Sequence, residues 1–172
     1  MRTFWLALIL LLEVPAWAQV PSEGREGDFG GNMFIIADLD DFWTTWDKPE
    51  NPTVNTTSKV THSRPVYAIV VFHDCKAGPD GKCKVTVRFD MTGPDGKPYD
   101  EPHGGTAWNN PPAPDHNLLA SVASMGFRLE PQDKFGRYEI KATLTDEVAD
   151  RSVILREIVT AEAESGESSP TT

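Results

Sequence analysis

Residues 83–91, CKVTVRFDM, alternate apolar and polar side chains without a break. A period of two places successive side chains on opposite faces of an extended strand, so this stretch predicts a strand with one buried and one wet face. The buried face is expected to carry Cys83, Val85, Val87, Phe89 and Met91. Residues 138–144, YEIKATL, repeat the pattern with Tyr138, Ile140, Ala142 and Leu144 facing inward.

Residues 65–73, PVYAIVVFH, are apolar on both faces, which favours a central strand. Shorter strands are expected at residues 33–37, 126–130 and 152–160. No amphipathic helical run exceeds about two turns, and residues 117–124 come nearest to one.

The motif GPDGK occurs at residues 78–82 and again at 93–97. Proline presets φ, aspartate bonds its own backbone and glycine accepts positive φ, so each copy predicts a tight reversal between strands. Closely spaced strands separated by such turns predict an antiparallel β-sandwich.

The stretch DKFGRY at 133–138, followed by an alternating strand that ends at Asp146, resembles the end of a bacterial immunoglobulin-like domain. In such domains a Gly-x-Tyr motif opens the penultimate strand, and the tyrosine forms a corner hydrogen bond. Residues 89–99 are similar to the middle hairpin of the same architecture. The resemblance covers roughly residues 64–160 and implies an all-β fold with a single immunoglobulin-like antiparallel β-sandwich. The whole chain also resembles secreted and periplasmic proteins of proteobacteria, to which no activity is attached.

Residues 1–18 have the pattern of a cleaved signal peptide, with Arg2 before an apolar stretch and a small-residue end at Ala18. The apolar stretch is too short to span a bilayer. We therefore expect cleavage after Ala18 and a periplasmic or secreted product. Residues 19–31 are predicted to be a flexible N-terminal segment, 32–160 the sandwich, and 161–172 a disordered acidic tail.

The formal net charge is −10, and no run of lysines and arginines occurs. Such a chain lacks the electrostatic footprint for nucleic acid or anionic lipid, so neither nucleic-acid binding nor membrane insertion is expected. Motifs for a serine hydrolase, a zinc protease or a phosphate-binding loop are also missing from the sequence. We predict no enzymatic activity and no cofactor.

Cys75 and Cys83 flank the first GPDGK turn. A hairpin would bring them together, and an oxidising compartment favours a disulfide between them. An alternative is a copper or zinc site that adds His73 and Asp74 to the two thiolates, although the usual C-x₂₋₄-C knuckle is missing. Free structural thiols are a third possibility. We predict the disulfide and assign no metal ligands.

Residues 99–117 form the longest stretch without strand character, and they contain His103, Trp108 and His116. Long loops in compact domains are often functional. The segment could be a ligand loop with Trp108 as a stacking platform, or a metal site on the two histidines. The preferred interpretation is a crossover between sheets, with Trp108 inserted at the sandwich edge.

Trp43 and Trp46 lie in an acidic cluster at residues 38–47, DLDDFWTTWD. Their rings could stack on a sugar or peptide, but closure of one end of the core is preferred because large aromatic side chains carry much apolar surface. A calcium site at the aspartates lacks the glycine and distal glutamate of a calcium loop.

Together these features predict an extracytoplasmic, non-enzymatic binding domain that contacts another envelope or secreted protein. Contact would be made through residues 99–117 or through an exposed strand edge. One alternative is a periplasmic copper- or zinc-binding protein that uses His103 and His116, with His62 or His73 as a further ligand. Another is a carbohydrate-binding module that uses Trp43, Trp46 or Trp108. The sequence does not identify the partner.

Overall fold

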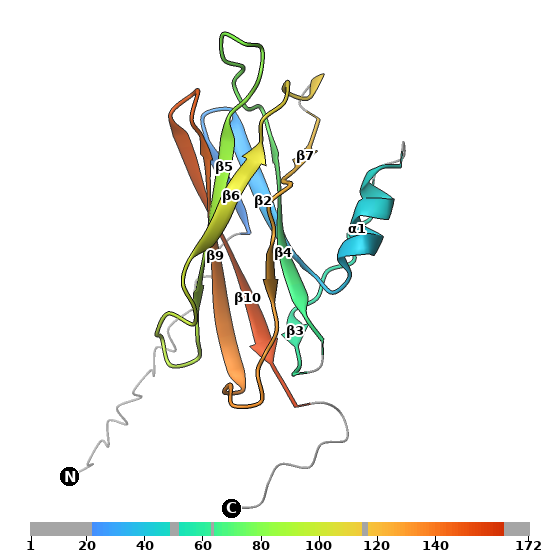
Figure 1. Cartoon of the computed structure of the whole chain (residues 1–172), viewed down its shortest axis with the longest axis vertical. Coiled ribbons are helices and arrows are strands. Elements are labelled where there is room, and N and C mark those ends of the chain that lie inside the picture. The colour runs from blue at the N-terminus through green and yellow to red at the C-terminus, as the bar shows by residue number, and fades with distance from the viewer. Residues whose placement is uncertain (1–21, 49–51, 63, 115–116, 164–172) are drawn as a thin grey trace, which may run out of the picture.

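The structure is a computed structural model that describes residues 22–48, 52–62, 64–114 and 117–163. Its strands form two five-stranded sheets that face each other (Figure 1). The first sheet contains β1 (Glu23–Glu26), β2 (Phe29–Ile36), β4 (Val66–His73), β7 (Leu119–Ala120) and β8 (Met125–Phe127). The second contains, in spatial order, β3 (Lys59–Val60), β10 (Arg151–Ala161), β9 (Gly136–Asp146), β5 (Val85–Thr92) and β6 (His103–Trp108). The predicted all-β, immunoglobulin-like sandwich is confirmed.

The core lies between the sheets and is built from the alternating positions that the sequence pattern indicated. β5 and β9 pair antiparallel with Val87 opposite Leu144, so their apolar faces coincide. All the side chains predicted to face inward on these two strands are buried. β4 is apolar on both faces because its second face, with Ile69 and Val71, packs beneath a helix.

That helix, α1 (Leu39–Trp46), covers the outer face of the first sheet (Figure 1). It begins after Asp38, whose Oδ1 accepts a hydrogen bond from the Asp41 backbone N–H at 2.9 Å, as an N-cap does. Phe42 is buried against the sheet, and the ring of Trp46 stacks on it with centroids 5.4 Å apart. The aromatic side chains of this cluster therefore hold the helix to the sheet.

The tyrosine corner expected from the immunoglobulin-like resemblance is present. Tyr138, almost fully buried, donates its hydroxyl hydrogen to the Lys134 carbonyl oxygen at 2.9 Å. Tyr99 packs edge-on to that ring and donates to Asp133 Oδ2 at 2.5 Å. Burial, together with the Asp133 carboxylate, raises the pKa of both phenols. Both hydroxyls therefore remain protonated and can donate.

Cys75 and Cys83 form the predicted disulfide, with their Cα atoms 5.9 Å apart. The bonded sulfurs rule out the alternative metal site, which needs both thiolates free. A buried carboxylate anchors the same loop, because Asp146 accepts the backbone N–H of Lys76 at 2.7 Å and that of Val148 at 3.0 Å. The disulfide loop is thus tied to the turn between β9 and β10.

The structure changes several of these expectations. Residues 23–31 do not belong to a flexible segment, because they form β1 and the start of β2, which pair with each other. Residues 117–124, which come nearest to a helical pattern in the sequence, contain β7, whose Leu119 and Ala120 pair with β4. The stretch 99–117 is not strandless, because it contains β6. β10 also runs to Ala161, one residue into the predicted tail.

The predicted signal peptide at 1–18 lies outside the described residues, as does residue 164 onward. No helix among the described residues is long and apolar enough to cross a membrane.

Candidate functional site: the free margin of β6

β6 is the last strand of the second sheet and pairs with β5 on one side (Figure 1). On its other side, the Val122 backbone N–H donates to the Ala107 carbonyl at 3.0 Å. The preceding residues of the strand, His103 to Thr106, are all exposed. Within the described ranges no strand pairs with their free side. We call His103–Thr106 the β6 margin.

Two glycines give the β6 margin its shape. A Cβ atom at Gly104 would lie 2.4 Å from the Val87 carbonyl oxygen, so β6 can approach β5 there only without a side chain. Gly105 differs, because a Cβ there would meet only Ala123, at 3.9 Å. Gly104 is therefore required by packing, whereas Gly105 leaves open space at the strand edge.

The β6 margin carries few of the devices that protect sheet edges. Soluble proteins usually guard an edge with lysine, proline, an inward-pointing charge or a covering segment. The sequence HGGT supplies neither lysine nor proline, and the covering contact from Val122 reaches only Ala107. Backbone hydrogen-bonding groups along the margin are thus accessible to another chain.

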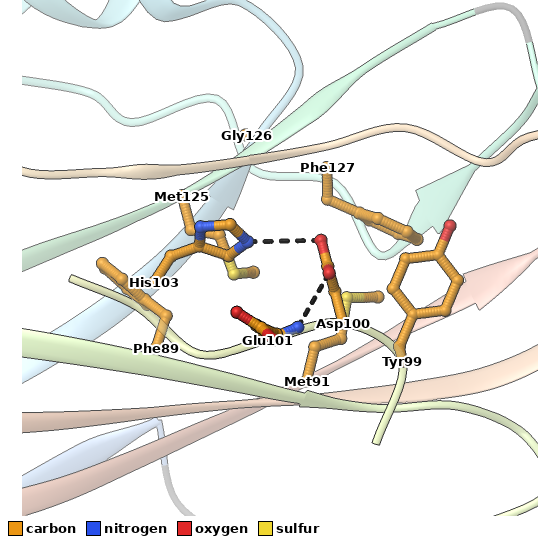
Figure 2. Close-up of a pocket in the computed structure, with 9 residues that line it drawn as sticks. All are labelled: Phe89, Met91, Tyr99, Asp100, Glu101, His103, Met125, Gly126 and Phe127. Atoms are coloured by element: carbon orange, nitrogen blue, oxygen red, sulfur yellow. Dashed lines mark hydrogen bonds and ion pairs between the residues drawn. The ribbon is translucent and has the colours of Figure 1, made fainter. Parts of the chain in front are cut away.

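A small hollow lies on the inner side of the β6 margin, between the two sheets (Figure 2). Its walls are the apolar side chains of Phe89, Met91, Met125 and Phe127. The free volume is about 30 Å³. That space is close to the volume of one water molecule, whereas small-molecule sites are typically ~300–1,000 Å³. The hollow is therefore too small to hold an organic ligand.

An exposed polar pair borders this hollow. His103 Nε2 lies 3.3 Å from Asp100 Oδ2, and the Glu101 backbone N–H donates to Asp100 Oδ1 at 2.7 Å (Figure 2). The hydrogen bond from Glu101, followed by that from His103, lowers the pKa of Asp100. Asp100 is consequently ionised at neutral pH and holds the His103 ring at the start of β6.

The outer side of the β6 margin borders a larger groove. It has a volume of about 450 Å³ and lies over β5, between β6 and β9. Its lining is formed by Thr86, Val87, Arg88, Pro102, His103, Gly104, Gly105, Thr143 and Thr145. At Gly104 and Gly105, no side chain stands between the groove and the strand edge.

Hydroxyl side chains cross this face of the sheet in a row. Ser152, Thr145, Thr86 and Thr106 stand opposite one another on β10, β9, β5 and β6. Neighbouring strands are ~4.8 Å apart, so the row places hydroxyls at nearly regular intervals. Thr145 and Ser152 hydrogen-bond to each other at 2.8 Å. The row ends at Thr106, in the β6 margin itself.

Positive charge gathers beside the hydroxyl row. Asp90 Oδ1 lies 3.2 Å from Arg88 Nη2, and Asp90 Oδ2 lies 3.1 Å from Lys141 Nζ. Burial raises the pKa of Asp90, but the hydrogen bonds and charges of Arg88 and Lys141 together lower it. The single Asp90 carboxylate thus pairs with two cations, and these three side chains together carry a net positive charge on the outer face of the second sheet.

The candidate residues from the sequence fall in three places. His103 lies in the β6 margin, and Trp108 ends β6, half-buried against the core with its Nε1–H donating to the Pro111 carbonyl at 3.0 Å. Trp43 and Trp46 pack around α1 on the outer face of the first sheet, and not at one end of the core between the sheets. His116 lies outside the described residues. These candidates therefore do not converge on one site.

No group of three histidine, cysteine, aspartate or glutamate side chains within the described ranges is placed to hold a metal ion.

The sequence did not reveal the β6 margin or the glycine that stands opposite Arg88. Glycine is depleted in strands, so HGGT does not suggest one. Alternation placed Arg88 on the wet face of its strand, but nothing local shows that a glycine stands opposite it. The second GPDGK turn, at residues 93–97, follows the strand at 85–92. A search for the strand that pairs with it across this turn would have pointed to β6.

The fold and the free margin define an immunoglobulin-like β-sandwich domain with an open sheet edge at β6. No protein-family model matches the chain, and no curated protein matches it in sequence. One similar solved structure is a Niemann-Pick type C2 protein from the Japanese carpenter ant, with 10% identity and a TM-score of 0.39 over 76% of this chain and 89% of that one. Another is an immunoglobulin-like protein from Pseudomonas aeruginosa, with 12% identity and a TM-score of 0.35 over 86% and 99% of the two chains. Neither is similar enough to transfer a ligand or activity.

Proposed function

We propose that this protein is an extracytoplasmic, non-enzymatic binding domain that takes an extended segment of another protein as an added strand beside β6. The observation that carries the proposal is the exposed, unguarded β6 margin at the end of a five-stranded sheet. In strand addition, main-chain hydrogen bonds supply affinity and alternate side chains supply specificity. The partner's identity is not needed for this geometry.

Val122 supports the proposal as an apolar contact beside the margin. Its backbone is bonded to Ala107 at one end of the free edge, and its side chain is 63% exposed. Interfaces commonly combine such an apolar contact with surrounding polar groups. A bound segment could pair with the margin and cover Val122 at the same time.

The disulfide supports an extracytoplasmic location. Disulfides such as Cys75–Cys83 form and persist in oxidising compartments and are rare in the cytosol. The signal-peptide pattern at residues 1–18 points to the same location.

A lysine introduced at the open edge of β6 tests the proposal, because it should block pairing with an added strand. Gly105→Lys would add an edge lysine, and the nearest contact of its Cβ is 3.9 Å away, so the fold should tolerate it. Ile154→Lys is the matched control, because Ile154 is 54% exposed and lies on β10, far from the margin in the strand order. A photocrosslinking residue at Val122, introduced in the native host, reports the partner.

We expect a crosslinked protein adduct that Gly105→Lys removes and Ile154→Lys retains. An adduct that survives Gly105→Lys would show that the partner does not use the β6 margin. Absence of any adduct in the parent protein would count against a partner at this edge.

A further inference from the structure

The groove beside β6 faces a position that a partner's side chain could enter. Arg88 of β5 stands directly opposite Gly104 of β6. Because position 104 has no side chain, nothing on β6 at that register separates Arg88 from the free edge. The groove on this face is lined by both residues, together with the hydroxyls of Thr86, Thr143 and Thr145.

The distances across the strands suit two long side chains. Adjacent strands lie ~4.8 Å apart, so a strand added beside β6 would lie about 10 Å from β5. The Arg88 side chain is 63% exposed, and an arginine side chain is long enough to lean over a neighbouring glycine. A glutamate on the added strand would extend toward it from the other side. The two groups could meet above the glycine.

The charge of this face favours an anionic partner group. Arg88 and Lys141 share the single Asp90 carboxylate. Over the outward positions of β5, β9 and β10, the cations are Arg88, Arg137, Lys141 and Arg156, whereas the carboxylates are Asp90 and Glu139. Four cations against two carboxylates leave a surplus of two positive charges in a chain whose formal net charge is −10. Such local complementarity selects partners by charge.

We infer that the segment bound at β6 is acidic and that an aspartate or glutamate facing the groove pairs with Arg88 across Gly104. This inference rests on the proposed strand addition and specifies the partner's chemistry. Arginine suits this role because its planar guanidinium presents several donors to a carboxylate. Hydroxyls of Thr86 and Thr143 supply further donors to the same group.

A peptide selection tests the inference without knowledge of the natural partner. Short random peptides displayed on phage would be selected on the full folded domain, and binders that protect the amides of His103–Thr106 from hydrogen exchange would be kept. The best acidic binder and its glutamate-to-glutamine counterpart would then be titrated against the parent protein, Arg88→Gln and Arg156→Gln. Arg156 is the matched control because it lies on the same face, on β10, and is paired with Glu139.

We expect β6-protecting peptides to be enriched in acidic residues at one alternating position. The parent protein should prefer the acidic peptide by about 2- to 5-fold, the effect of one partly exposed ion pair. Arg88→Gln should abolish this preference while the peptide still protects β6, and Arg156→Gln should retain it.

The outcomes separate the two proposals. Peptides that protect β6 with no acidic preference, or with a preference that Arg88→Gln leaves unchanged, would overturn the role of Arg88 but leave strand addition standing. If no selected peptide protects the β6 margin, strand addition itself is wrong, and the inference about Arg88 is wrong with it.

Discussion

The two margins of the second sheet, at β10 and at β6, differ in how far other segments cover them. At the β10 margin, β3 pairs with Thr160 and Ala161, and Glu26 Oε2 accepts the Ser152 backbone N–H at 2.7 Å. β1 lies so close that a Cβ at Gly24 would meet the Ile154 carbonyl oxygen at 3.1 Å. On the β6 side, the Val122 backbone N–H donates to the Ala107 carbonyl, and within the described residues no strand pairs with the free side of the β6 margin itself.

This difference shows that β1, β3 and the Glu26 side chain cover the β10 margin of the sheet, whereas the β6 margin is left open. The covered margin joins the two sheets and completes the core. The open margin leaves backbone hydrogen-bonding groups accessible. The accompanying risk of aggregation is modest because β6 is short, and short edge strands are poor templates for pairing. This selective exposure is the physical basis for the proposal that β6 binds a partner.

The largest expected effect is at the covered margin. Leu155 on β10 is fully buried, so Leu155→Ala should lower the free energy of unfolding by about 2–5 kcal/mol. Val122→Ala at the open margin is the matched control, because Val122 is 63% exposed and its loss should cost under ~0.5 kcal/mol. Urea unfolding of both variants measures the contrast. Equal losses would mean that the margins do not differ in packing.

Removal of the disulfide should act mainly on the open side. In the loop-entropy model, closing so short a loop is worth about 2.5 kcal/mol, so Cys75→Ala with Cys83→Ala should lower stability by roughly that amount. The Cys83 backbone N–H donates to the Asn110 carbonyl at 2.9 Å, just beyond the end of β6. Amide exchange should therefore increase in β6 before it increases in β10. The opposite order would show that the disulfide does not support the open margin.

Substitutions at Gly104 and Gly105 form a matched pair, and their expected effects on stability are of intermediate size. Gly104→Ala should destabilise the domain by about 1–3 kcal/mol, because the new methyl group collides with the Val87 carbonyl. Gly105→Ala should change stability by less than ~0.5 kcal/mol, since its Cβ meets only Ala123 at an ordinary contact distance. Thermal unfolding of the two variants is the check. Similar melting temperatures would argue against the close approach of β6 to β5.

The smallest effect concerns pH. Because the folded-state pKa of Asp90 is lowered from 3.8, its stabilising contribution is complete above that value and is lost as the pH falls through the lowered pKa. Asp90→Asn should therefore reduce the loss of stability on acidification, measured by urea unfolding at neutral and acidic pH. The same variant frees Arg88 and should strengthen its preference for an acidic peptide at neutral pH. An unchanged preference would weaken the case for Arg88.

Much of the fold could be predicted because its signals are local. Alternation identified the core faces of β5 and β9, and the motif at Gly136 and Tyr138 identified the corner. β1 was missed because EGRE is polar and glycine-containing, and its ordering comes from pairing with β2. β6 was missed for a similar reason, since it is held by β5 through a bulged register that no local pattern shows.

The candidate site could be predicted only in outline. An exposed strand edge was expected, but the named aromatic and histidine candidates did not define it. His103 alone among them lies in the β6 margin. The decisive residues, Arg88 and Gly104, are ordinary in sequence and become a pair only through strand register.

By itself the sequence determined the features that neighbouring residues create: the alternating strands, the GPDGK reversals, the short disulfide loop and the tyrosine corner four residues from its acceptor. Only the tertiary structure decided which strand stands at the margin and which side chains meet across the sheet. Thr86, Thr106, Thr145 and Ser152 come from four strands and form one row because of pairing between distant segments. Strand order and register depend on long-range contacts that compete over the whole chain, and a local pattern contains no record of that competition.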